Sequence, residues 1–84
     1  MAQNDDCQAL TERLRSNKKS TTFADVKSIL EAAGFTMHPR KRGSHRAFSK
    51  AGCFFSPSIP EGRGPLLVAY VRKAIQALEE CCDD

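Results

Sequence analysis

The stretch HPRKRGSHRAF, residues 38–48, gathers the residue types of this chain that could bind a polyanion and move a proton. Three consecutive cations precede a Gly-Ser pair, and a histidine and a further arginine follow it. Guanidinium groups match phosphate oxygens in geometry, and the imidazole of histidine titrates close to neutral pH. These residue types could therefore hold a polyanion through its phosphates while His45 handles a proton.

Cleavage of RNA without a metal ion has three requirements that such a site can meet. The ribose 2′-hydroxyl loses a proton as it attacks phosphorus, the charged intermediate needs cations or N–H donors, and the leaving 5′-oxygen gains a proton. One general acid–base group is typically worth about 10²–10⁴-fold in rate. We interpret His45 as this group, with RNA contacts from its neighbours Arg40, Lys41, Arg42, Gly43, Ser44 and Arg46.

Simpler interpretations of the same residues remain open. A histidine beside arginines can be a surface side chain with no task, and a basic turn can simply be solvated. His38 is a weaker catalytic candidate than His45. Ser44 has neither a GxSxG context nor an acid partner, so a capping or phosphate-contact role fits it better than that of a nucleophile.

The distribution of charge says more than its sum. The 84 residues predict one domain, and the net charge of +3 is too small to name a partner. Positions 35–60, however, contain five Lys or Arg residues and no Asp or Glu, whereas acidic residues cluster at the two ends of the chain. A local excess of this kind indicates a surface that binds polyanions.

Two further features bear on location and cofactors. No apolar run approaches the ~20 residues of a membrane span, and the N-terminus lacks a signal pattern, so we predict a cytoplasmic protein. In that compartment Cys7, Cys53, Cys81 and Cys82 should stay reduced, with Cys53 packed as a small hydrophobic residue. Zinc-ligand spacing is absent, and we expect no metal or other cofactor.

Helical patterns occupy both ends of the chain. Residues 6–16 predict a short helix within an N-terminal extension that covers residues 1–20. A clearer helix should begin at Thr22, with Asp25 completing a capping box, and end at Gly34. A last helix should begin near Pro65 and bury a face made of Leu67, Tyr70, Val71, Ala74 and Leu78. Residues 81–84 should be a frayed acidic tail.

Three strand patterns lie between the two main helices: FTMHPR, SHRAFS and CFFSPSI, the last two joined by a KAG turn. Strand alternation predicts that Arg46 and Phe48 share one face, whereas His45, Ala47 and Ser49 share the other. The fold class is therefore α+β in the order α-β-β-β-α over residues 21–80. Both helices should cover one face of a three-stranded antiparallel sheet and leave the other open to a partner.

The motifs and their order resemble those of a known family. FADVKSILEAAGF is followed by RKRGSHRAF, a short hairpin, SIPEGRGP and a closing YVRKAIQALEE. Over residues 22–80 this arrangement resembles the HicA family of toxins, the YcfA-like mRNA interferases. The most specific signals are the helix ending in Gly-Phe, the Gly-Ser-His that follows, and the Ile-Pro before the closing helix.

The resemblance implies a fold like that of double-stranded-RNA-binding domains and an activity that cleaves mRNA without a metal. It implies that His45 is the catalytic residue and that a HicB-like antitoxin binds the toxin and covers the site. The sequence departs from the family where many relatives have a second histidine, since Arg46 stands there. Glu61 and Gly62 likewise stand where a histidine often follows Ile-Pro.

Because of these departures, two other functions remain open. The chain could be an RNA-binding module without catalysis, which would hold duplex RNA through its shape and phosphates. It could also be a protein-interaction partner with no RNA role. The sequence leaves open the RNA sequence preferred, the cleavage position, the oligomeric state of the free protein, and whether residues 1–20 pack against the rest.

Overall fold

The hydrogen-bonded order of the strands follows the chain. A computed structural model describes residues 2–39 and 43–81, with side chains from residue 7 onward. Within these residues the sheet is antiparallel, with β2 between β1 and β3. The elements are α1 (Ala2–Ser16), α2 (Phe23–Ala32), β1 (Thr36–Met37), β2 (His45–Ser49), β3 (Ser58–Pro60) and α3 (Val68–Cys81). The predicted α+β class is confirmed.

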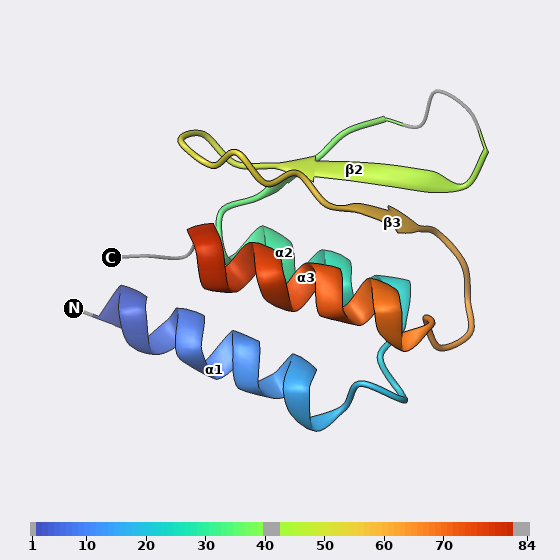
Figure 1. Ribbon diagram of the computed structural model, residues 1–84, viewed down its shortest axis with the longest axis horizontal. Helices are drawn as coiled ribbons and strands as arrows, with labels where there is room; N and C mark the ends of the chain where they lie inside the picture. Colours follow the sequence, from blue (N-terminus) through green and yellow to red (C-terminus); the bar gives the residue numbers. More distant parts are fainter. Residues whose placement is uncertain (1, 40–42, 82–84) are drawn as a thin grey trace.

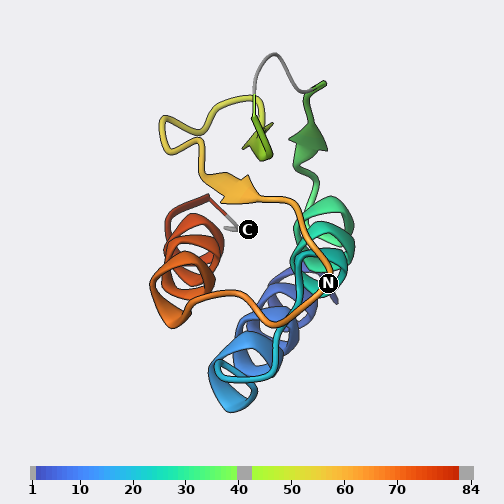
Figure 2. The ribbon, with the colours of Figure 1, turned by 90° about the vertical axis from the view of Figure 1, so that its right-hand side faces the viewer.

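The elements are arranged in layers. Helices α2 and α3 lie side by side beneath the sheet, α2 under β1 and α3 under β3 (Figures 1 and 2). Helix α1 lies on the side of α2 and α3 that faces away from the sheet, and it packs against α3. The molecule thus has three layers: the sheet, the pair α2 and α3, and α1. Among the described residues, no helix covers the face of the sheet that points away from α2 and α3.

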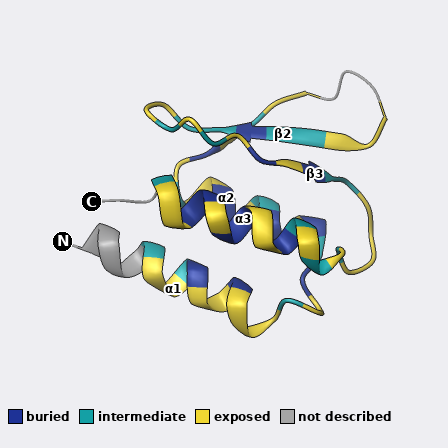
Figure 3. Ribbon diagram, in the orientation of Figure 1, coloured by how far each residue is buried: buried dark blue, intermediate teal, exposed yellow. Residues whose placement is uncertain are grey.

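The core forms where the sheet meets the helix pair, and most elements contribute buried residues (Figure 3). Phe48 of β2 and Ile59 of β3 are fully buried against residues of α2 and α3. The Phe48 ring lies 6.1 Å from that of Phe23, within the range of favourable aromatic pairs. The core residues are Leu14, Phe23, Val26, Ile29, Leu30, Phe35, Phe48, Ile59, Val71, Ala74, Ile75, Ala77 and Leu78.

Both predicted boundaries of α2 are confirmed by their hydrogen bonds. The Thr22 hydroxyl accepts from the Asp25 N–H, and the Asp25 carboxylate accepts from the Thr22 N–H, which completes the capping box. Gly34 follows the helix with a φ of 100°, and the next N–H, that of Phe35, reaches back to the Leu30 carbonyl. This left-handed cap turns the chain directly into β1.

The N-terminal extension forms a larger helix than predicted, because α1 runs from Ala2 to Ser16 instead of beginning near residue 6. Leu14 is 1% exposed and belongs to the core, and Leu10 packs against it. Arg15 forms ion pairs with Glu12 and with Glu79 of α3. The extension is therefore an integral part of the packed structure.

The third strand is shorter than predicted, because residues 53–57 are not part of it. Pro57 has no N–H to donate, although its carbonyl accepts from the Phe48 N–H at 2.9 Å. The Phe48 carbonyl accepts instead from the hydroxyl of Ser56 at 2.7 Å. A side chain thus replaces a ladder hydrogen bond, and regular pairing begins only at Ser58.

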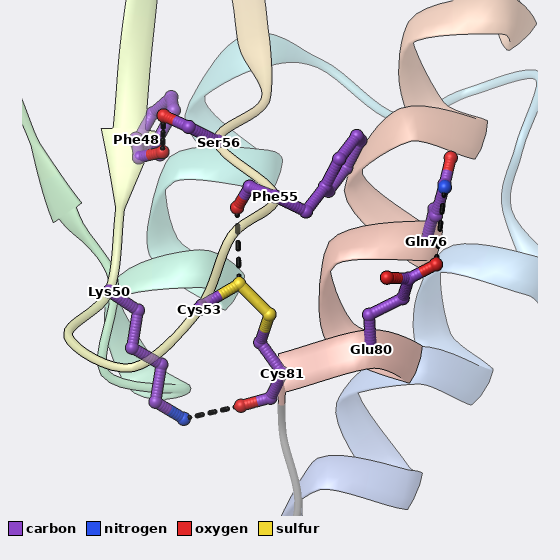
Figure 4. The surroundings of a disulfide bond; sticks show 8 residues. All are labelled: Phe48, Lys50, Cys53, Phe55, Ser56, Gln76, Glu80 and Cys81. Carbon is purple, nitrogen blue, oxygen red and sulfur yellow. Dashed lines mark hydrogen bonds between the residues drawn. A yellow bond between two sulfur atoms is a disulfide. The ribbon is translucent and has the colours of Figure 1, made fainter.

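The prediction of reduced cysteines is wrong for Cys7, Cys53 and Cys81, whereas Cys82 lies outside the described residues. Cys53, in the turn between β2 and β3, forms a disulfide with Cys81 at the end of α3, with 5.5 Å between their Cα atoms (Figure 4). Cys7 is disulfide-bonded as well. The ammonium of Lys50 donates to the Cys81 carbonyl at 2.9 Å, beside the disulfide (Figure 4). The hairpin and the C-terminal end of α3, far apart in sequence, are therefore covalently joined.

The last helix begins at Val68, so the prediction of a start near Pro65 is wrong. Pro65 forms an isolated bridge with Thr22, and the Leu66 N–H donates to the Thr21 carbonyl at 2.8 Å. These contacts hold the chain extended until residue 67. Leu67 consequently lies outside the helix and is 71% exposed. The rest of the predicted face is buried or half-buried, and residues 82–84 of the predicted tail lie outside the described residues.

Candidate functional site

The Gly-Ser-His motif lies at the start of β2, at the end of the molecule where α3 also begins (Figure 1). Gly43 has a φ of 61°, which favours glycine, and it lets the chain turn into the strand. The carbonyl of Ser44 accepts a hydrogen bond from the N–H of Glu61 at 2.6 Å. The turn is therefore attached to the segment that follows β3. The predicted RNA contacts Arg40, Lys41 and Arg42 lie outside the described residues.

The imidazole of His45 is exposed and lies beside α3. Its ring centroid is 5.9 Å from that of Tyr70, and the two ring planes are inclined at 85° in a T-shaped arrangement. Tyr70 is in the first turn of α3 and is half-buried. The ring is thus accessible to solvent, but one side of it rests against an aromatic neighbour.

Strand alternation describes β2 well except at its first residue. Phe48 is fully buried, and Arg46, two residues earlier, is half-buried opposite the buried Ile59, as expected for one shared face. We expected His45 to face away from the helices, yet its ring contacts Tyr70 of α3. At this end of β2 the ring lies close to the first turn of α3.

Arg46 connects three segments of the chain. Its Nε donates to the Glu61 carboxylate at 3.2 Å, and one Nη donates to the carbonyl of His38 at 3.4 Å. The side chain of Arg46 is only 20% exposed and that of Glu61 35%. The guanidinium predicted to contact RNA therefore already has two protein partners. It connects β2 to the segments that contain Glu61 and His38.

The second histidine of the stretch has a separate environment. The Nε2 atom of His38 lies 2.5 Å from the hydroxyl of Ser49, near the opposite end of β2 from His45. Backbone pairing places His38 beside Ala47, whose carbonyl accepts its N–H at 2.9 Å. The side chain of His38 is exposed, and its hydrogen bonds connect it to β2.

Two residues of this region were not predicted to belong to the site. Tyr70 was assigned only to the apolar face of the last helix, and Glu61 only to a loop. The position of Glu61 follows from the strand register. Because β2 and β3 are antiparallel and Pro60 pairs with His45, Glu61 must lie beside Ser44. No comparable signal in the sequence identifies Tyr70, because its contact depends on how α3 packs against the sheet.

The geometry can support proton transfer to or from a bound molecule. An exposed imidazole follows a glycine turn, and no atom of the described residues lies within 4 Å of a Cβ added at Gly43. The neighbouring guanidinium of Arg46 donates to the carboxylate of Glu61, which has a further interaction of its own. Across residues 2–39 and 43–81, no group of three or more His, Cys, Asp or Glu side chains is placed to hold a metal ion, and no helix could cross a membrane.

Comparison of the chain with protein-family models, with curated proteins and with solved structures finds no match in any of the three.

Proposed function

We propose that this chain is a metal-independent endoribonuclease of the HicA type, the toxin of a type II toxin–antitoxin pair that cleaves mRNA. The observation that carries the proposal is the exposed imidazole of His45 directly after the Gly43–Ser44 turn, in a stretch with five cations and no acid. The α-β-β-β-α order of the chain after α1 is compatible with the fold that the resemblance implies, that of double-stranded-RNA-binding domains.

The reaction assigned to the site is a transesterification within RNA. The 2′-oxygen bonds to the adjacent phosphorus, the bond from phosphorus to the 5′-oxygen breaks, and a 2′,3′-cyclic phosphate and a 5′-hydroxyl result. His45 either accepts the proton of the 2′-hydroxyl or supplies the proton of the 5′-oxygen. Cations at residues 40–42, with Gly43 and Ser44, hold the phosphate, whereas Arg46 supports the turn through Glu61.

The test compares purified wild-type protein with His45→Ala on a labelled single-stranded RNA, in buffer with a chelator. We expect wild type to release fragments that end in a cyclic phosphate, and His45→Ala to be slower by about 10²-fold or more. His38→Ala is the matched control, since it removes the other histidine, and it should cleave like wild type. Equal cleavage by wild type and His45→Ala would remove His45 from the mechanism.

A second candidate function is RNA binding without cleavage. The position of Arg46 favours it, because a guanidinium bound to Glu61 and to the His38 carbonyl replaces the second histidine of many relatives. In that case wild type binds RNA with an affinity that falls steeply with salt but leaves it intact. Loss of binding on combined substitution of Arg40, Lys41 and Arg42 by alanine is expected under both functions.

The proposed partner is a HicB-like antitoxin that covers the site, and the proposed location is the cytoplasm, where mRNA lies. An acidic surface on the antitoxin should face residues 40–46, so reversing the charges of Arg40 and Arg42 should weaken the complex. Disulfides are uncommon in that compartment, so each assay is run with and without reductant. A complex that is indifferent to charge reversal would contradict the predicted docking face.

A further inference from the structure

The contact between His45 and Tyr70 joins the candidate site to α3. Ring centroids 5.9 Å apart at 85° lie within the range of favourable edge-to-face aromatic pairs. The two residues are 25 positions apart in sequence (70 − 45), on a strand and on a helix. The contact therefore depends on tertiary packing.

The ring of Tyr70 packs at the edge of the core and not inside it. Its neighbours on the inner side of α3, among them Val71, Ala74 and Ile75, are buried, whereas Tyr70 is half-buried at the edge of the core. Tyr70 is fixed by the first turn of the helix, where its N–H donates to the Leu67 carbonyl at 2.9 Å. A ring at this place provides a rigid support for an imidazole that is otherwise exposed.

Proton transfer requires that the imidazole be held in one orientation. An exposed histidine at the start of a strand can sample several rotamers, and a misplacement of about 1 Å can reduce a rate 10²-fold. The ring of Tyr70, packed edge-to-face, excludes some of those rotamers without placing a charge beside the imidazole. The support depends on the aromatic ring of Tyr70 and not on its hydroxyl.

We propose that Tyr70 is the positioning residue of this site: its ring holds the His45 imidazole in the orientation in which it exchanges a proton with RNA. The inference rests on the proposed nuclease function and adds to it a residue from outside the Gly-Ser-His motif. Tyr70 acts through His45, so its effect belongs to the chemical step and not to the binding of RNA.

Three variants test this role. Tyr70→Leu removes the ring, Tyr70→Phe keeps the ring and removes the hydroxyl, and Leu67→Ala alters an exposed side chain of the same segment. We expect Tyr70→Leu to lower kcat by about 10- to 100-fold with KM within about threefold. Tyr70→Phe and Leu67→Ala should stay within about threefold of wild type in both constants.

The contact itself is measured by nuclear Overhauser effects between the two rings in the wild-type protein, which do not depend on activity. Their absence overturns the proposal, even if Tyr70→Leu does not fold. If wild type cleaves RNA and Tyr70→Leu has an unchanged kcat, or if Tyr70→Phe loses as much as Tyr70→Leu, positioning by the ring is overturned while the nuclease assignment stands. If wild type cleaves no RNA, the nuclease assignment falls and the positioning role falls with it.

Discussion

The side chains of Arg46 and Glu61 form an ion pair, with 3.2 Å between Nε and Oε1, directly beside the turn that carries His45. Glu61 also donates its N–H to the carbonyl of Ser44, so its backbone and its side chain both contact the segment 44–46. The pair is partly shielded from solvent. Glu61, in the segment that follows β3, thus has a structural connection to the Gly-Ser-His motif.

Under the proposed function, substituting Glu61 by Gln should strengthen RNA binding. The change removes a negative charge next to the site, so the charge of the Arg46 guanidinium is no longer balanced by the Glu61 carboxylate. The dependence of log K on log salt should then become steeper by up to about 0.7, the value for one additional phosphate contact on single-stranded RNA. Affinity measured at several salt concentrations checks this. Glu12→Gln, the same charge change on α1, should leave the slope unchanged, and an equal slope for both variants would contradict the prediction.

Breaking the disulfide between Cys53 and Cys81 should destabilise the fold. The cross-link closes a loop with a sequence separation of 28, for which the loss of unfolded-state entropy predicts about 3–4 kcal/mol. Cys53→Ser, Cys81→Ser and the double variant should lose similar amounts, because each removes the same bond. Urea unfolding measures the loss. Phe54→Ser, next to Cys53 but fully exposed, should change the stability by less than about 0.5 kcal/mol.

Helix α1 should contribute substantially to stability through Leu14. This side chain is 1% exposed within the core, and truncation to alanine leaves a cavity that typically costs about 2–5 kcal/mol. Leu67→Ala is the control, since a side chain that is 71% exposed should lose less than about 1 kcal/mol. Chemical denaturation of both variants gives the comparison. Similar losses would show that α1 does not pack in solution as it does here.

Replacing Gly34 by alanine should destabilise the junction between α2 and β1. Gly34 has a φ of 100°, which L-residues rarely adopt, and an added Cβ would lie 3.3 Å from Cε of Lys50. Strain of this kind costs about 1–3 kcal/mol. Gly62→Ala, where no atom lies within 4 Å of the added Cβ, should be close to neutral. Thermal unfolding of the two variants distinguishes them, and equal melting temperatures would contradict the prediction.

Local patterns were sufficient for the elements whose signals lie within a few residues. The capping box of Thr22 and Asp25 and the glycine cap at Gly34 depend on hydrogen bonds within one helix end. The burial of Phe48 follows from strand alternation. For the same reason the α+β class could be predicted, since each helix and strand has its own period of apolar residues.

The remaining features were decided by contacts between distant segments. Pro65 was expected in a helix, but contacts with Thr21 and Thr22 hold that segment extended. The spacing of apolar residues along the helix carries no information about such contacts between distant segments. Cys53 and Cys81 form a bond because the hairpin and the end of α3 meet in space. The sequence by itself determined that a glycine turn presents His45 at the start of a strand. Only the tertiary structure decided that Tyr70 and Glu61 stand beside it, because helix packing and strand register depend on the whole core.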